Sequence, residues 1–206
     1  MELIVRFFAE ALFPAASRSA RRRRAAAFAA ELGLRFHAEG PPPDPDTSDR
    51  LASLEMLGLR FTRPVADAFW GSFEGRHAIG FENAVWDKRG RRHVPYRFTA
   101  VRLIRAAPDL LVAAPKEAAM TEQWFRSDGR RLPVPKRSGR TAASADPAFA
   151  SGVLQALSQA GLEPLERSWT VREDWVFGWR RGRLRTGREG QRLRFLLAAA
   201  EAVERG

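Results

Sequence analysis

Apolar side chains recur at every second position along much of residues 68–114, and this spacing constrains the fold more than any other feature. A period of two places side chains on one face of an extended chain, so the stretch predicts β-strands rather than helices. Turn signals divide it at residues 74–76 and at the charged run 87–92. A short apolar run beginning at Leu110 is expected to form the last of these strands. We therefore predict an antiparallel meander of about four strands.

Apolar residues with helical spacing lie on both sides of this stretch. The expected helices include those over residues 19–32, 147–160 and 189–204, with shorter ones after Thr47 and over residues 117–125, and a β-hairpin is expected around Glu173 and Asp174. Strands and helices come in runs rather than in regular alternation. The sequence thus predicts an α+β fold, in which helices pack against the meander and the C-terminal hairpin.

The proline-rich stretch over residues 41–47 is the clearest candidate for a linker. It separates an N-terminal amphipathic and basic helical region, residues 1–40, from the rest of the chain. Residues 48–206 are long enough to bury one hydrophobic core. We expect them to form a single α+β domain.

The chain is strongly basic, with a net charge of +11 over 206 residues. Of its 35 basic residues only Lys88, Lys116 and Lys136 are lysines, so 35 − 3 = 32 are arginines. Such a charge favours acidic partners, namely nucleic acid, an anionic membrane or an acidic protein surface. The absence of cysteine excludes disulfides, thiolate zinc sites and cysteine nucleophiles, and it fits a reducing cytosol.

No pattern in the chain matches a known reaction centre. The three histidines, His37, His77 and His93, have no second ligand at helical or hairpin spacing. Paired carboxylates in an apolar setting and nucleophile motifs are also missing. The sequence therefore predicts no catalytic residues, no metal site and no cofactor.

An apolar stripe near the N-terminus precedes a run of arginines, an arrangement typical of membrane-surface anchors. Residues 2–13 are too few and too charged to span a bilayer. An ordinary helix packed on the domain, or a helix that docks on another protein, has the same pattern. The residues predicted to bind a membrane or a protein partner are Leu3, Ile4, Phe7, Phe8, Leu12, Arg21, Arg22, Arg23 and Arg24.

A second basic tract follows the aromatic residues Trp175, Phe177 and Trp179. Aromatic rings beside guanidinium groups suit single-stranded nucleic acid. The period of two places the three rings on one sheet face, which we expect to pack against the last helix as core. The alternative anion- or nucleic-acid-binding residues are Arg180, Arg181, Arg183, Arg185, Arg188 and Arg192.

Five segments together resemble a set of uncharacterised actinobacterial proteins: residues 20–36, 70–83, 96–115, 145–157 and 175–182. The resemblance implies an N-terminal membrane helix, a short arginine run and a cytoplasmic α+β domain, with no assigned activity. This chain departs from it at residues 2–13, where a full membrane span would stand.

These features favour a non-catalytic binding or scaffold module in the cytoplasm. Such a module would associate peripherally with the anionic inner face of the membrane, or with a protein partner. The alternative is a nucleic-acid-binding protein that uses the tract 180–194. The sequence predicts neither a particular partner nor an oligomeric state.

Overall fold

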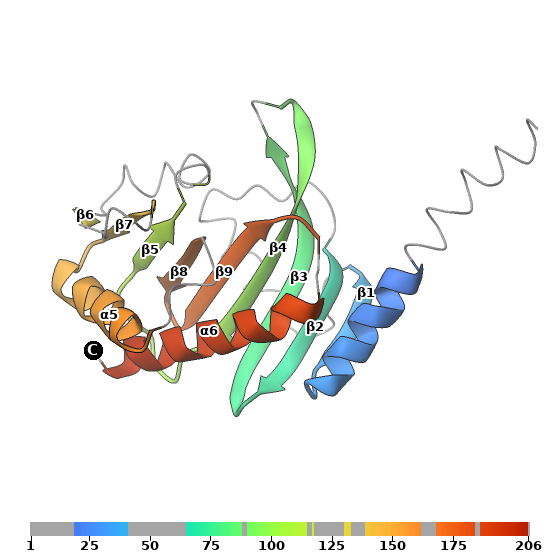
Figure 1. Ribbon diagram of the computed structural model, residues 1–206, viewed down its shortest axis with the longest axis horizontal. Helices are drawn as coiled ribbons and strands as arrows, with labels where there is room; N and C mark the ends of the chain where they lie inside the picture. The colour runs from blue at the N-terminus through green and yellow to red at the C-terminus, as the bar shows by residue number, and fades with distance from the viewer. Residues whose placement is uncertain are drawn as a thin grey trace, which may run out of the picture.

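The computed structural model describes residues 19–40, 65–87, 90–114, 117, 130–132, 139–161, 168–183 and 186–205. Their strands form one nine-stranded antiparallel sheet, in the order β1-β2-β3-β4-β9-β8-β5-β7-β6 (Figure 1). The strands are β1 Arg35–Glu39, β2 Ala66–Phe73, β3 Arg76–Asp87, β4 Arg92–Arg102, β5 Leu110–Ala113, β6 Arg130–Leu132, β7 Thr141–Ser144, β8 Ser168–Arg172 and β9 Trp175–Arg181. The predicted α+β class is confirmed.

The four-stranded meander consists of β1 to β4, which lie side by side in chain order. The strand predicted at Leu110, β5, is not next to β4, because the β8–β9 hairpin lies between them. Strand β9 pairs with β4 and strand β8 pairs with β5. The hairpin turns at Glu173, which has a positive φ of 52°, and Asp174, as the sequence predicts.

Three described helices lie on one face of the sheet (Figure 1). They are the helix over residues 19–31, α5 Pro147–Gln159 and α6 Thr186–Arg205. The side chain of Asp146 caps α5 by accepting a hydrogen bond from the Phe149 amide at 3.0 Å. Gly33 follows the first helix with a φ of +70°, a conformation that glycine adopts without strain.

The sheet has a hydrophobic cluster on each face. On the helix face, Val176 of β9 and Leu193 of α6 belong to a cluster that includes all three helices. On the other face Trp175, Phe177 and Trp179 pack with Phe98, and each of the three is at most 3% exposed. Burial of these rings as core is confirmed, but the expectation that they pack against the last helix is wrong. Residues of β9 alternate between faces, and α6 covers the face of Val176.

Strand β1 is part of this sheet, because it pairs with β2 from Arg35 to Glu39. The N-terminal helix packs on the sheet through Phe28 and Ala29. The predicted linker, residues 41–47, the apolar stripe, residues 3–12, the short helix predicted after Thr47 and all but the first residue of the one predicted over 117–125 lie outside the described residues. Within the described part, no helix combines the length and the apolar character that crossing a membrane requires.

Candidate functional site

A buried ion cluster joins α6 to the centre of the sheet. Arg97 of β4 is fully buried, and its Nε donates a hydrogen bond to Oε1 of Glu189 at 3.3 Å. The Thr99 hydroxyl donates to the same carboxylate oxygen. Nη1 of Arg192 donates to the other oxygen, Oε2, at 2.9 Å. Both oxygens of a completely buried carboxylate are therefore paired, which offsets the cost of removing it from water.

The two arginines of this cluster repel each other electrostatically. Burial, together with the positive charge of Arg97, lowers the pKa of Arg192 to about 9. Glu82 lies beside Arg97 in the register of β3 and β4, and it is also buried. The cluster thus concentrates opposite charges beneath the first two turns of α6, where they hold that helix in one position.

Aromatic rings connect the ion cluster to the N-terminal helix. The guanidinium carbon of Arg97 lies 4.6 Å from the centre of the Phe69 ring, in cation–π geometry. Phe69 in turn packs edge-on against Phe28 of the first helix, with ring centres 6.3 Å apart. Gly80 makes room for this stack, because a Cβ there would lie 2.4 Å from Phe69 Cζ and 2.9 Å from Arg97 Nη2.

Asp67 ties the start of the N-terminal helix to the sheet. A bulge between Ala66 and Phe69 gives Asp67 a positive φ of 46°. Its carboxylate is buried and lies 3.0 Å from Arg21 Nη2 and 3.8 Å from Arg22 Nε. Arg22 is also bonded to Glu39. Two of the predicted membrane-binding arginines therefore make ion pairs within the chain.

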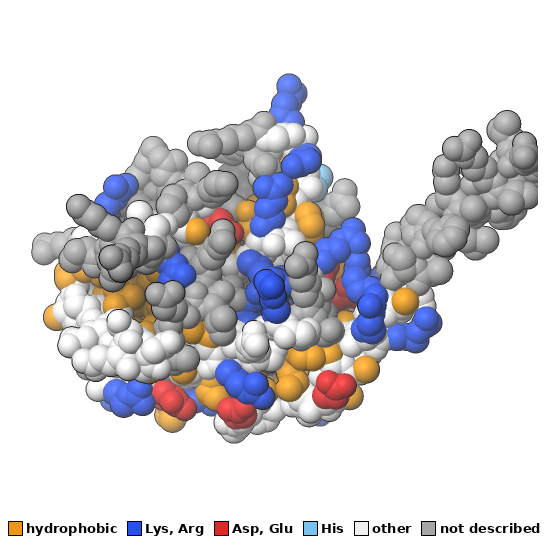
Figure 2. All heavy atoms as spheres, in the orientation of Figure 1, with side chains coloured by type: hydrophobic (Ala, Val, Ile, Leu, Met, Phe, Trp, Pro, Cys, Tyr) orange, Lys and Arg blue, Asp and Glu red, His pale blue; other side chains and the backbone are white. Residues whose placement is uncertain are grey.

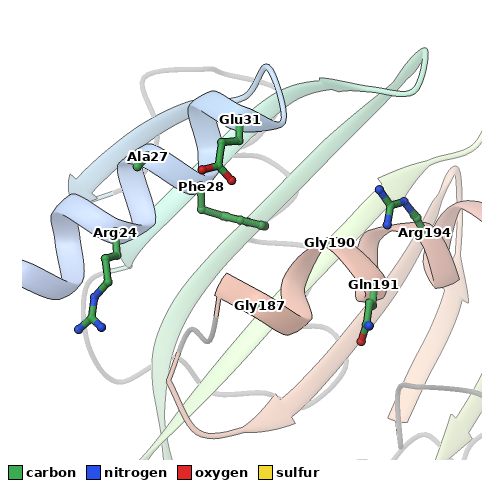
Figure 3. A pocket seen from close by; sticks show the side chains of 8 residues that line it. All are labelled: Arg24, Ala27, Phe28, Glu31, Gly187, Gly190, Gln191 and Arg194. Atoms are coloured by element: carbon green, nitrogen blue, oxygen red, sulfur yellow. The ribbon is translucent and has the colours of Figure 1, made fainter.

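The other two arginines of the run are exposed. Arg23 donates a hydrogen bond to Oγ of Ser19 at 2.9 Å. Arg24 lines a groove between the N-terminal helix and α6 (Figure 3). The structure therefore divides the arginine run between internal ion pairs and surface positions.

The groove has a volume of about 510 Å³, and one face of each helix forms a wall. Its lining residues are Arg24, Ala27, Phe28 and Glu31 from the first helix, and Gly187, Gly190, Gln191 and Arg194 from α6. In both helices these positions follow the spacing i, i+3, i+4, i+7 of a single helical face. The Phe28 side chain points into the space between the two helices (Figure 3).

Exposed arginines gather at one end of the sheet, where β4, the N-terminal helix and α6 begin and β9 ends. We define this basic end by Arg23, Arg91, Arg92, Arg181, Arg183 and Arg188, all of them exposed. Among the described residues, none of the six forms an ion pair with a carboxylate. Glu39, whose carboxylate lies at the same end, is bonded to Arg22.

At the opposite end of the sheet, two arginines pair with carboxylates, whereas the exposed Arg105 bonds to the main-chain oxygen of Glu204. Arg76 holds the Glu204 carboxylate through two hydrogen bonds of 2.7 and 2.6 Å, and these lower the pKa of Glu204. Arg102 pairs with Asp174 at 2.8 Å. Figure 2 agrees with this contrast: basic side chains extend over the upper and right-hand parts of this face, while most visible acidic side chains gather along the lower edge.

The arginines predicted over residues 180–192 as an alternative site for nucleic acid do not form one surface. Arg181, Arg183 and Arg188 belong to the basic end, whereas Arg192 is only 4% exposed and is bonded to Glu189. Arg180 is half-buried on β9, and Arg185 lies outside the described residues. The aromatic residues beside the tract are buried, so they offer no stacking surface to bases.

Within the described ranges, no group of three or more histidine, aspartate or glutamate side chains could hold a metal ion. Sequence reasoning missed Arg97, Thr99 and Glu189. One signal was available: Glu189 lies four residues before Leu193, on the apolar face of the last helix.

Comparisons with known proteins bear on the fold. No family model matches the sequence, and no curated protein matches it. The chain is similar in structure to the mycobacterial trehalose monomycolate transport factor A, TtfA, with a TM-score of 0.63. The match covers 88% of this chain and 93% of that chain at 11% sequence identity. At that identity, the likeness shows a shared fold.

Proposed function

We propose that this protein is a non-catalytic binding module that lies peripherally on an anionic membrane surface, at the cytoplasmic face. The basic end, which includes Arg23, would face the lipid headgroups, with Arg24 beside it. The apolar stripe formed by Leu3, Ile4, Phe7, Phe8 and Leu12 would insert between the acyl chains.

The observation that carries this proposal is the separation of charge between the two ends of the sheet. Six exposed arginines lie at the basic end without carboxylate partners among the described residues. Each basic residue near an anionic leaflet contributes about 1 kcal/mol of attraction at moderate salt. At the opposite end Arg76 and Arg102 are paired with carboxylates, so the positive field is weaker there and the molecule would approach an anionic surface preferentially through the basic end.

Two further features support the same orientation. Trp86 is 43% exposed near the end of β3, beside His93 and close to the arginines of the β3–β4 turn. An exposed indole is well suited to the membrane–water interface. Ser19, the first described residue, also lies at the basic end, so the apolar stripe precedes this end directly in the chain.

The comparisons are compatible with a binding role. The mycobacterial protein of similar fold is named a transport factor. Separately, the resemblance of the sequence to actinobacterial proteins implies an α+β domain next to a membrane.

Flotation of the full-length protein with vesicles tests this proposal. We expect binding to vesicles that contain phosphatidylglycerol, weak binding to phosphatidylcholine alone, and loss of binding as salt rises. Arg181→Glu with Arg183→Glu should weaken binding by at least 30-fold, since roughly 2 kcal/mol of attraction is lost. The matched control, Arg105→Glu with Arg205→Glu, changes the net charge equally at the opposite end and should have a much smaller effect.

Insertion of the stripe is tested separately by Phe7→Glu with Phe8→Glu. This variant should abolish flotation at physiological salt, where charge attraction alone is weak. Equal binding by this variant would contradict insertion, and equal weakening by the two arginine pairs would contradict the proposed orientation. A labelled single-stranded oligonucleotide is the third probe. If it binds at physiological salt while vesicles do not, the nucleic-acid alternative replaces the membrane proposal.

A further inference from the structure

Ser19 places an exposed hydroxyl in contact with the basic end. It lies on the helix over residues 19–31, and its Oγ accepts a hydrogen bond of 2.9 Å from Nη1 of Arg23. The two residues are four positions apart, so their side chains share one face of the helix. Among the described residues, no carboxylate pairs with Arg23. A negative charge on the Ser19 oxygen would therefore meet a guanidinium group that has no anionic partner.

The arginines before Arg23 are engaged elsewhere. Arg21 and Arg22 lie 3.0 and 3.8 Å from the buried carboxylate of Asp67, and these ion pairs hold the helix on the sheet. The exposed Arg23 takes no part in them. A negatively charged group at Ser19 could thus pair with Arg23 without breaking the contacts that position the helix.

The sequence around Ser19 is strongly basic. Arg18 precedes it, four arginines follow over residues 21–24, and residues 11–30 contain neither aspartate nor glutamate. Protein kinases select their substrates partly by such charge patterns, because opposite charges on the two surfaces favour the encounter. An exposed serine within an arginine run fits a kinase whose substrate-binding surface is acidic.

We propose that Ser19 is a phosphorylation site whose phosphate releases this protein from an anionic membrane, an inference that rests on the membrane association proposed above. A serine kinase would transfer the γ-phosphoryl group of a nucleoside triphosphate to Ser19. The bond from Oγ to the γ-phosphorus forms as the bond from that phosphorus to the β–γ bridging oxygen breaks. The nucleoside diphosphate leaves, and the hydroxyl proton passes to a base of the kinase.

The phosphate would change the charge of the basic end directly. A phosphoserine carries a charge of about −1.5 to −2 at pH 7, and its oxygens match the two N–H groups of a guanidinium edge. The six exposed arginines of the basic end would then be opposed by up to about two negative charges. Arg23 would also be occupied within the chain. Both effects weaken the attraction of this end to anionic headgroups.

Vesicle flotation of full-length protein with phosphoserine incorporated at position 19 during translation tests the release. The matched control carries phosphoserine at Ser151, an exposed position on α5, which packs against β6 and β7 at the far edge of the sheet. Relative to the unmodified protein, Ser19→phosphoserine should weaken binding to phosphatidylglycerol vesicles by roughly tenfold or more, and Ser151→phosphoserine by roughly threefold or less. Both proteins should keep the wild-type thermal unfolding transition, which separates release from misfolding.

A phosphorus NMR titration shows, without any membrane, whether Arg23 holds the phosphate. Pairing with a guanidinium group should lower the second pKa of the Ser19 phosphate below its ordinary value of about 6. Arg23→Gln should raise this pKa toward that value. Arg205→Gln removes the same charge at the opposite end of the sheet and should leave the pKa lowered. Equal pKa values with and without Arg23 would contradict the pairing.

The natural modification is tested on protein from the cells that make it, separated into membrane-bound and unbound fractions. Phosphopeptide mass spectrometry should find phosphate on Ser19 chiefly in the unbound fraction. Absence of phosphate from Ser19 in both fractions, or equal occupancy in the two, would overturn the inference. If the unmodified protein fails to bind anionic vesicles, the membrane proposal is wrong and this one falls with it. If it binds and the Ser19 phosphate has no effect, only this one is wrong.

Discussion

At the scale of single residues, Glu189 is the side chain on which most contacts of the candidate site converge. It receives hydrogen bonds from Arg97, Thr99 and Arg192 while fully buried. Removing one member of a buried ion cluster leaves the others charged and without their partner, and this costs more than the cluster contributes when intact.

Glu189→Ala is therefore expected to lower the free energy of unfolding by about 3–5 kcal/mol. Urea denaturation followed by circular dichroism measures the change. Glu201→Ala on the same helix is the control, because its ion pair with Arg205 is exposed and 4.0 Å long, and it should stay within about 0.5 kcal/mol. A loss below 1 kcal/mol for Glu189→Ala would mean that other groups compensate for the buried charges of Arg97 and Arg192.

Glu204 gives the protein an acid-sensitive contact. Two hydrogen bonds from Arg76 lower the pKa of Glu204. The contribution of this ion pair to the free energy of unfolding is therefore complete above the ordinary glutamate pKa. It is lost as pH falls through the lowered value. Glu204→Gln should cost roughly 1 kcal/mol at pH 7 and progressively less below about pH 4. Urea midpoints measured from pH 7 to pH 3 test this, and a difference independent of pH would contradict it.

At the scale of elements, Gly80 of β3 and Gly190 of α6 differ in the space around them. At Gly80 a Cβ would clash with Phe69, whose ring supports Arg97. At Gly190 a Cβ would meet open space. The first glycine is required by packing within the chain, whereas the second leaves room outside it.

The same substitution should therefore have opposite effects at the two positions. Gly80→Ala is expected to destabilise the protein by roughly 1–3 kcal/mol through overpacking. Gly190→Ala is expected to stabilise it by up to about 1 kcal/mol through helix propensity. Thermal unfolding of the two variants measures the sign of each change in stability. Destabilisation by Gly190→Ala would show that α6 needs this glycine for its own fold.

At the scale of the whole molecule, the six exposed arginines without a carboxylate partner at the basic end contrast with the ion pairs of Arg76 and Arg102 at the opposite end. Exposed apolar side chains mark both ends: Trp86 lies at the basic end and Ile104, 83% exposed, lies at the opposite end. If the protein lies on the membrane through its basic end, Trp86 would touch lipid and Ile104 would not.

Trp86→Ala should weaken binding to anionic vesicles by about fivefold, because about 1 kcal/mol of apolar contact with the interface is lost. Ile104→Ala should leave the vesicle affinity unchanged, although Ile104 is more exposed. Co-sedimentation over a range of lipid concentrations measures both affinities. Equal effects of the two substitutions would argue against an approach through the basic end.

Local patterns in the chain were sufficient to predict many of its elements, but not the short strands β6 and β7. The period of two over residues 68–114, the cap at Asp146 and the turn at Glu173 are each encoded by neighbouring residues. The α+β class follows from the order of these elements. The aromatic residues of β9 were correctly expected to be buried, because alternation places them on one face.

Contacts between distant segments were decided by the tertiary structure alone. Insertion of the β8–β9 hairpin between β4 and β5 depends on pairing across more than 70 residues, as in Phe98 with Trp179. The partners Arg97 and Glu189 are 92 positions apart. The sequence determined that this protein is a basic α+β chain with an apolar N-terminal stripe. Only the tertiary structure decided which arginines form ion pairs within the protein, because an ion pair depends on distance in space and not on separation along the chain.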